Sequence, residues 1–434
     1  MLLGLALSFT SGCSKKSDTT GIATNGTEGA TYVGSEACKE CHEEVYNGWL
    51  TTFHAYKFRT ASPDFVIADF ERAKPLKDGG AQTSVSRKGD EFFITTTGPQ
   101  GQLATYKVDY VVGSIWKQRY VTKFPNGALQ VLPVQWNVDA KEWTVYHGLD
   151  EFKPGETGFW ADNDQSFQTQ CMGCHTTNSQ INYDAATNTY KTTWTRMGVG
   201  CEACHGPGSR HVRADIPDKY TSIINPSTMP DPRRASMICG SCHTRGMSVD
   251  GKTAYPVNYT PGDQLNFLFD QNPGTYPDRS PKEHHQQYDD WANSGHAAAG
   301  VMCWDCHSPH LRGKSNRFQL KLPGSLLCET CHKIQPQGVH GLHSVNNCIG
   351  CHMPNTIKSA SQGDLRSHTF VVSRPILTVK SGDAKKQPNS CNLCHYHKDY
   401  EPERLVHFLR AVKKPDTCKQ CHEHQDEDLD DDNY

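Results

Sequence analysis

The sequence predicts a fold with little regular secondary structure, in which short helices and loops predominate and one small antiparallel β-rich insert interrupts them. Only 36% of the 434 residues are hydrophobic, whereas typical globular chains have about 45–50%. The chain has 16 Phe, 8 Trp and 17 Tyr and a formal net charge of −3, which is not the composition of a disordered chain. It also has 19 Cys and 22 His. Something other than aliphatic side chains should therefore fill part of the interior.

Charge and hydropathy exclude two classes of protein. A net charge near zero provides no basic excess of the kind that binds nucleic acid, so no nucleic-acid partner is expected. No run of about 20 apolar residues follows the N-terminal segment, so no membrane-spanning helix is expected either.

Eighteen of the 19 cysteines form nine copies of the pattern Cys-x-x-Cys-His. The copies are Cys38, Cys41 and His42; Cys171, Cys174 and His175; Cys201, Cys204 and His205; Cys239, Cys242 and His243; Cys303, Cys306 and His307; Cys328, Cys331 and His332; Cys348, Cys351 and His352; Cys391, Cys394 and His395; and Cys418, Cys421 and His422. Two thiols at this spacing add to the two vinyl groups of one haem, and the adjacent His binds its iron. Structural zinc or disulfides would not need a His after every second Cys.

The motifs therefore predict nine covalently attached haem c groups and a multihaem cytochrome c fold, with short helices and loops around a haem chain. None of the nine has Lys in place of His, the substitution that marks an open catalytic haem in some multihaem reductases. We therefore assign no catalytic residue from the motifs.

Thirteen further histidines are available as second axial ligands, so histidine on both sides of every haem is compatible with the count. The favoured distal ligands are His54, His211, His296, His310, His368 and His343, with His340 an equal alternative to His343. His211 and His310 closely follow proximal histidines, which favours ligation of a neighbouring haem over their own. For each, the competing interpretation is an exposed or hydrogen-bonded surface His. Surface positions are expected for His147, His284, His285, His397, His407 and His424.

The motif spacing divides the chain into four segments. We expect a lipoprotein-type signal and linker in residues 1–30, a first haem segment in 31–75, a β-rich insert in 76–150, and a haem domain with eight motifs in 151–434. The insert should have about five strands, over Phe92 to Thr97, Thr105 to Val112, Lys117 to Phe124, Leu129 to Val134 and Trp143 to His147. Pro402 to Lys413 should form a helix, and the acidic residues after it a solvated tail that has a basic docking partner as its alternative.

The N-terminus predicts export. Leu2 to Phe9 is a short apolar stretch that ends shortly before Cys13, the residue that would be acylated in a bacterial lipoprotein. A plain secretory signal with an incidental Cys is the alternative, because a basic n-region is missing and Thr10 replaces an aliphatic residue. Either signal places the protein in the periplasm, on the outer membrane or cell surface, or outside the cell.

Several stretches resemble multihaem cytochromes of the cytochrome c554-like family. They are Tyr32 to Cys38, Phe124 to Gly127, Cys201 to His211, Cys351 to Pro354 and Arg366 to His368. The resemblance implies stacked and perpendicular haem pairs, distant kinship with hydroxylamine oxidoreductase and pentahaem nitrite reductase, and distal roles for His211 and His310. A ninth motif at Cys418 and the absence of the tetratricopeptide repeats that many octahaem relatives have are departures from the family pattern.

Nine motifs in this length give about one haem per 48 residues, which forces haems into contact and favours electron transfer in anaerobic respiration or to an extracellular acceptor. The expected partners are redox proteins or that acceptor. One alternative is a reductase of a nitrogen or sulfur oxyanion with one open haem, which also needs acid–base groups. Another is a self-associating filament subunit, in which a His from one copy ligates a haem of the next.

Overall fold

The computed structural model describes residues 27, 29–72, 76–78, 81–146, 151–213, 215, 217–313, 317–333, 339–342, 347–394 and 396–411. Several predicted features lie outside these residues: the signal with Cys13, the distal candidate His343, the proximal His395, the whole ninth motif and the acidic tail. His147 and His424 lie outside them as well.

The helices are short. They are α1 (Glu36–Lys39), α2 (Glu43–Trp49), α3 (Phe167–Gln170), α4 (Met172–His175), α5 (Glu202–His205), α6 (Pro232–Gly240), α7 (Gln287–Ala292), α8 (Gly295–Ala298), α9 (Cys303–Cys306), α10 (Leu326–Glu329), α11 (Val339–Leu342), α12 (Cys348–His352), α13 (Pro375–Ser381) and α14 (Pro402–Ala411). Helical turns also occur at η1 (His54–Tyr56), η2 (Asn163–Gln165), η3 (Pro226–Thr228) and η4 (Leu265–Phe267). Helices this short are unstable alone in water, so packing must hold them in place.

The strands form five antiparallel sheets in the described part of the chain. They are β1 (Phe58–Thr60), β2 (Leu76–Asp78), β3 (Ala81–Lys88), β4 (Glu91–Thr97), β5 (Leu103–Lys107), β6 (Tyr110–Val112), β7 (Lys117–Lys123), β8 (Leu129–Asn137), β9 (Glu142–Val145), β10 (Thr176–Gln180), β11 (Tyr183–Asp184), β12 (Thr189–Tyr190), β13 (Thr193–Met197), β14 (Gly246–Ser248) and β15 (Phe269–Gln271). The order is β1-β6-β7-β8-β9 in the largest sheet and β2-β3-β4-β5 in the second, with three two-stranded pairs.

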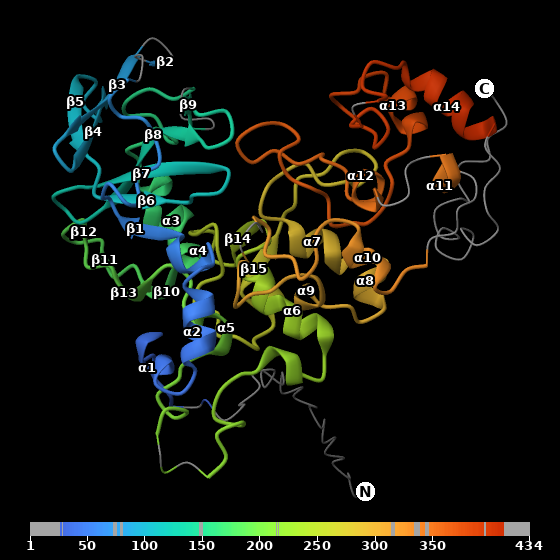
Figure 1. The fold of residues 1–434 in the computed structure, drawn as a ribbon. Helices are drawn as coiled ribbons and strands as arrows, with labels where there is room; N and C mark the ends of the chain where they lie inside the picture. Colours follow the sequence, from blue (N-terminus) through green and yellow to red (C-terminus); the bar gives the residue numbers. More distant parts are fainter. Residues whose placement is uncertain are drawn as a thin grey trace, which may run out of the picture.

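The insert therefore contains two sheets, in place of one unit of about five strands. The single strand expected over Thr105 to Val112 is two strands, because β5 pairs with β4 while β6 pairs with β1 and β7. β3 was not predicted from the sequence, because most of its residues are polar and apolar side chains do not recur at every second position. β1 comes from the preceding segment and closes the edge of the larger sheet (Figure 1).

Strand β8 joins the insert to the rest of the molecule, because all nine of its residues are buried. On one side Leu132 and Trp136 pack in an aromatic core with Tyr120 and Trp160, between the two sheets. On the other side Val131 belongs to a second core that includes the motif residue Cys171. The larger sheet thus rests directly against the second Cys-x-x-Cys-His motif.

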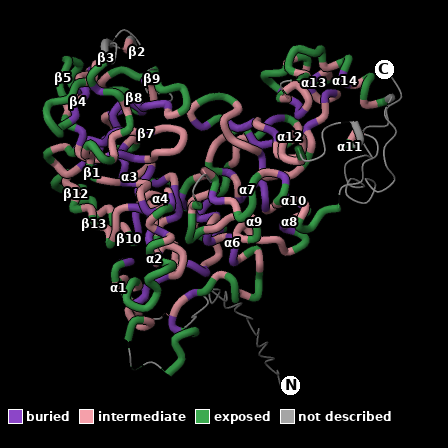
Figure 2. Tube along the Cα trace, in the orientation of Figure 1, coloured by how far each residue is buried: buried purple, intermediate pink, exposed green. Residues whose placement is uncertain are grey.

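Outside the insert, buried residues alternate with exposed ones in short stretches along the chain (Figure 2), and a third core of Leu265, Phe269, Tyr288, Trp291 and Ala297 lies there. Figure 1 shows the two large sheets together at one end, helices α6 to α10 in the middle, and α12 to α14 at the far end. This confirms the predicted fold class, with short helices, many loops and a β-rich insert. Every helix in the described residues is too short or too polar to cross a bilayer.

Candidate haem sites and the pocket at His175

A continuous cavity of about 4690 Å³ runs through the helical part of the molecule, and the cysteines of eight motifs line it. A pocket for one small ligand typically has about 300–1,000 Å³, so this cavity has room for several large groups. All described cysteines carry free thiols. The donor set and the space therefore fit covalently attached haems.

Among the described residues, six pairs of histidine rings face each other across this cavity. The pairs and their centroid distances are His42 with His211 at 6.2 Å, His54 with His243 at 6.3 Å, His205 with His310 at 6.0 Å, His296 with His332 at 5.8 Å, His307 with His368 at 6.3 Å, and His340 with His352 at 6.2 Å. An iron that binds one nitrogen of each ring at about 2 Å separates the centroids by about 6 Å. The spacing thus fits one haem iron between each pair.

Each pair joins one motif histidine to one histidine outside the motifs. The structure brings five of the favoured distal candidates opposite a motif histidine, and His211 and His310 face neighbouring motifs rather than their own. Opposite His352 it places His340, one of the two alternatives for that position.

The ring pairs fall into two orientation classes. Four have interplanar angles of 8°, 18°, 24° and 15° and are nearly parallel. The other two, His54 with His243 and His296 with His332, have angles of 76° and 85°. The chain would therefore impose two different ligand-field symmetries on its irons.

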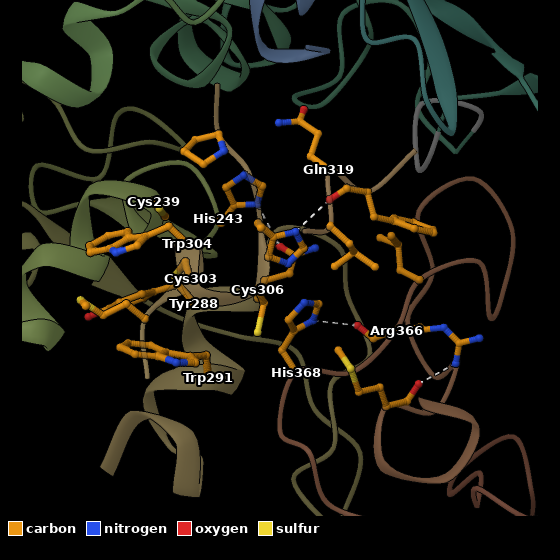
Figure 3. Close-up of a pocket in the computed structure, with 18 of the residues that line it drawn as sticks. Cys239, His243, Tyr288, Trp291, Cys303, Trp304, Cys306, Gln319, Arg366 and His368 are labelled. Carbon is orange, nitrogen blue, oxygen red and sulfur yellow. Dashed lines mark hydrogen bonds between the residues drawn. The ribbon is translucent and has the colours of Figure 1, made fainter. Parts of the chain in front are cut away.

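Backbone carbonyls orient the motif histidines. Nδ1 of His205 lies 2.8 Å from the Ile224 carbonyl oxygen, and Nδ1 of His307 lies 2.8 Å from that of Phe318. The distal His368 bonds in the same way to the Arg366 carbonyl oxygen at 3.1 Å (Figure 3). Such a bond fixes the ring and leaves Nε2 free to bind a metal.

Burial keeps these imidazoles neutral, which is the form that binds iron. It lowers the pKa of His54 to about 3, with a smaller contribution from the charge of Lys57. It also lowers the pKa of His368 to about 3 and that of His243 to about 4. Figure 3 shows His243 and His368 facing one space together with Cys303, with aromatic side chains beside it.

Cysteines of different motifs also meet. Thiols are in hydrogen-bonding contact between Cys38 and Cys201, Cys174 and Cys242, Cys239 and Cys303, and Cys328 and Cys348. Three further pairs of thiols lie farther apart but still influence each other electrostatically: Cys204 and Cys239, Cys306 and Cys331, and Cys351 and Cys394. Numbered along the chain, the motifs therefore follow the spatial order 1-3-4-5-6-7-8, and motif 2 is joined to motif 4.

The second motif differs from the other described ones. Its His175 makes no ring contact with another imidazole within the described residues. Nδ1 of His175 lies 3.1 Å from the Lys57 carbonyl oxygen, so its ring is oriented like the others. Burial, and to a smaller extent the charges of Lys57 and Arg119, lower the pKa of His175 to about 4. A haem held here would have one axial position without a histidine from these residues.

Cationic and proton-bearing side chains surround this position. The Arg119 guanidinium lies 3.7 Å above the Tyr146 ring centroid, and its NH1 donates to the Tyr146 hydroxyl at 3.0 Å. Lys117 and Arg245 line the same cavity. Burial raises the pKa of Tyr146, which keeps its proton at neutral pH. Arg245 lies 3.9 Å from the Glu283 carboxylate, and burial lowers the pKa of Lys117 well below its usual value, so Arg119 is the main positive charge that can hold a small anion here.

His284 and His285, expected at the surface, instead line this cavity, so that expectation was wrong. His285 is accessible from the cavity although it lies deep in the molecule, and burial lowers the pKa of both rings well below the usual value. His284 Nδ1 has no hydrogen-bond partner among the described residues. The spacing of the motifs gave no reason to predict His284 and His285 in this pocket, since they lie far from the motif at Cys171 in the sequence. The one signal that could have found them is that two histidines are adjacent.

Two family models match the chain. One, described as cytochrome c554 and c-prime, matches residues 37–82 and 145–206, and the other, a doubled CXXCH motif, matches residues 296–337. The chain is also 25% identical over 170 residues to the protein "cytochrome c nitrite reductase subunit NrfA" of Nitratidesulfovibrio vulgaris (strain Hildenborough). That match covers 31% of this chain and 32% of NrfA, so the chain spans about a third of the length of that relative.

Two solved structures are similar. The outer cell wall cytochrome OcwA has a TM-score of 0.60 and 22% identity, with 86% of each chain covered. An undecahaem cytochrome from the S-layer of Carboxydothermus ferrireducens has a TM-score of 0.45 and 20% identity, with 87% of this chain and 59% of that one covered. The likeness to OcwA shows that the fold is that of a known cytochrome. With its Cys-x-x-Cys-His motifs and this fold, the chain is a multihaem c-type cytochrome that is similar to the cytochrome c554 family over residues 37–82 and 145–206.

Proposed function

We propose that this chain carries nine covalently attached haems, most of them bound by two histidines, and passes electrons along them in anaerobic respiration or to an acceptor outside the cell. Each haem, when bound, supplies an iron that takes up and releases one electron. The protein supplies the ligands, the burial and the charges that determine the reduction potentials.

The observation that carries the proposal is the set of six facing imidazole pairs. A histidine on each side of an iron leaves no position for a substrate, which suits electron transfer. The thiol contacts between motifs that are neighbours in space give further support. Each of the two thiols would hold its own haem, so a contact between them would bring the edges of the two haems together.

The order of the motifs provides a direct test. Motif 5, with Cys306, links motifs 1 to 4 to motifs 6 to 8. We expect rapid reduction of the loaded protein to show one kinetic phase, and Cys306→Ala, which disables attachment at motif 5, to split it into two. Cys13→Ala is the matched control and should retain nine haems by intact mass and one phase. A single phase in Cys306→Ala, or a mass that corresponds to fewer than nine haems in the unaltered protein, would contradict the proposal.

We also propose that the protein is exported and held at the cell surface or in the periplasm by a lipid on Cys13, with redox proteins or an extracellular acceptor as partners. The outer cell wall origin in the name of OcwA, a protein of similar fold, supports this proposal. Cys13→Ala should release the protein from membranes into the soluble fraction. Equal membrane association of both forms would contradict the anchor.

A second candidate function, reduction of a small nitrogen or sulfur oxyanion, is favoured by the pocket at His175. Within the described residues the pocket offers an axial position that no imidazole faces, Arg119 to bind the anion, and Tyr146, His284 and His285 to hold or donate protons. Motif 4 supplies the electron path, because Cys174 and Cys242 are in contact.

Ligand binding tests this second function. The oxidised protein should bind nitrite or cyanide at one haem, and the reduced protein should bind one equivalent of carbon monoxide. Absence of a spectral change with all three ligands would contradict an open site at His175.

A further inference from the structure

A closed loop forms one wall of the cavity at His175. Residues 356–365, here called the strap, are paired at their base by hydrogen bonds of 3.3 Å in both directions between the backbones of Ile357 and Leu365. The Asp364 carboxylate accepts from the backbone N–H groups of Ser359 at 2.7 Å, Ala360 at 2.6 Å and Ser361 at 2.9 Å. The strap therefore has a fixed shape of its own and can shift as one body.

The strap supports the segment that carries the adjacent histidines His284 and His285. Lys358 forms a parallel bridge with Glu283, and its backbone N–H donates to the Lys282 carbonyl oxygen at 3.2 Å. His284 and His285 follow directly, and His285 has a φ of 67°, a conformation that costs a non-glycine residue free energy and needs support from its surroundings. Movement of the strap would therefore move these two rings.

Two side chains of the β-rich insert hold the strap. Nζ of Lys117 donates to the Ser359 carbonyl oxygen at 2.7 Å, and the Asn137 amide donates to the Ser361 hydroxyl at 2.9 Å. Lys117 and Asn137 are directly opposite each other at one end of the β7–β8 pair. This cross-strand pair thus supplies two of the bonds that hold the strap, which lies more than 200 residues later in the chain. The Tyr276 hydroxyl supplies two others, because it donates to the Thr356 carbonyl oxygen at 3.3 Å and accepts from the Gln362 amide at 3.0 Å.

We propose that Lys117 is a positioning residue for the pocket at His175: by fastening the strap to the insert, it sets the width of the pocket and the placement of His284 and His285. This rests on the proposed open site at His175. This role for Lys117 also gives the β-rich insert a function. The insert supplies Arg119 and Tyr146 to one side of the pocket, and through Lys117 it holds the strap on the other side.

The position of the strap should determine how large a ligand can reach the open haem. A hydrogen bond from a buried donor changes a two-state equilibrium by about ten-fold, so its loss should raise the population of displaced strap by that factor. A bulky ligand needs the displaced strap, whereas a small one does not. The ratio of the association rates of imidazole and cyanide with the open haem therefore reports on the strap.

We expect Lys117→Met to raise the imidazole-to-cyanide rate ratio about ten-fold in the loaded protein, and Ser361→Ala, which removes only the bond to Asn137, to raise it about three-fold. Lys123→Gln, on the exposed face of the same strand, is the matched control and should leave the ratio unchanged. The low-spin spectrum of the remaining haems checks that each variant is folded.

An unchanged ratio in both Lys117→Met and Ser361→Ala would overturn the role of the strap while leaving the open site intact. Failure of the unaltered protein to bind either ligand would overturn the open site itself, and the proposal with it. If Lys117→Met does not fold, an unchanged ratio in Ser361→Ala alone overturns the proposal.

Discussion

The buried carboxylate of Glu202 offers a quantitative test of how the first haem site is built. Glu202 is 1% exposed and lies inside the third motif. It accepts hydrogen bonds from the backbone N–H groups of Val33 at 2.9 Å, Gly34 at 2.8 Å and Gly208 at 2.8 Å. The last belongs to the loop that carries His211, the histidine opposite His42. One side chain thus fastens the N-terminal segment and a distal ligand to the same motif.

Glu202→Ala would leave the buried N–H groups of Gly34 and Gly208 without an acceptor, and the half-buried N–H of Val33 as well. Each of the two buried donors costs about 1–3 kcal/mol, so the free energy of unfolding should fall by about 2–6 kcal/mol. Glu202→Gln keeps one acceptor oxygen and should lose about 2–4 kcal/mol. Because His211 loses its support, a fraction of the haem at His42 should become high-spin in the oxidised protein.

Urea unfolding of the loaded protein, followed by tryptophan fluorescence and the haem absorption band, measures both effects. Glu156→Ala is the matched control, because Glu156 is exposed and accepts one backbone bond, from Lys153 at 2.8 Å. It should lose less than about 1 kcal/mol. If Glu202→Ala lost no more than Glu156→Ala and kept the haem at His42 low-spin, the reasoning would be refuted.

Three further changes test other parts of the molecule. His310→Ala should convert one low-spin haem into a high-spin haem that binds carbon monoxide, while the exposed His407→Ala should leave the visible spectrum unchanged; equal spectra would refute the axial pairing. Arg119→Leu should weaken cyanide binding at the open haem about ten-fold, as measured by spectral titration, whereas the exposed Arg213→Leu should not; equal affinities would remove Arg119 from the pocket. Trp160→Ala should destabilise the insert by about 3–5 kcal/mol in urea unfolding, because this side chain is 1% exposed; a loss below 1 kcal/mol would contradict its place in the core.

The sequence predicted the cysteines and motif histidines because thioether chemistry imposes a fixed local spacing. It could not choose between His340 and His343, since both lie in the same short segment and no local rule separates them. The structure separates them by placing the His340 ring opposite His352. Axial pairing is a property of the assembled fold and has no fixed sequence offset.

The pocket at His175 was not predictable in the same way. Arg119 and Tyr146 come from strands of the insert, or directly after them, whereas His284 and His285 come from a loop more than 100 residues later. Only tertiary packing against β8 brings these groups to one motif. The second sheet was missed for a related reason, because β3 has a polar sequence that packs only once β4 is beside it.

Electron paramagnetic resonance of the oxidised, fully loaded protein tests both the histidine pairs and the open site at His175. The angle between two axial imidazole planes determines the anisotropy of a low-spin signal. We expect two low-spin classes, one from the four nearly parallel pairs and one from the two nearly perpendicular pairs, together with a high-spin signal from the haem at His175 that cyanide abolishes. A spectrum with low-spin signals alone, unchanged by cyanide, would contradict it.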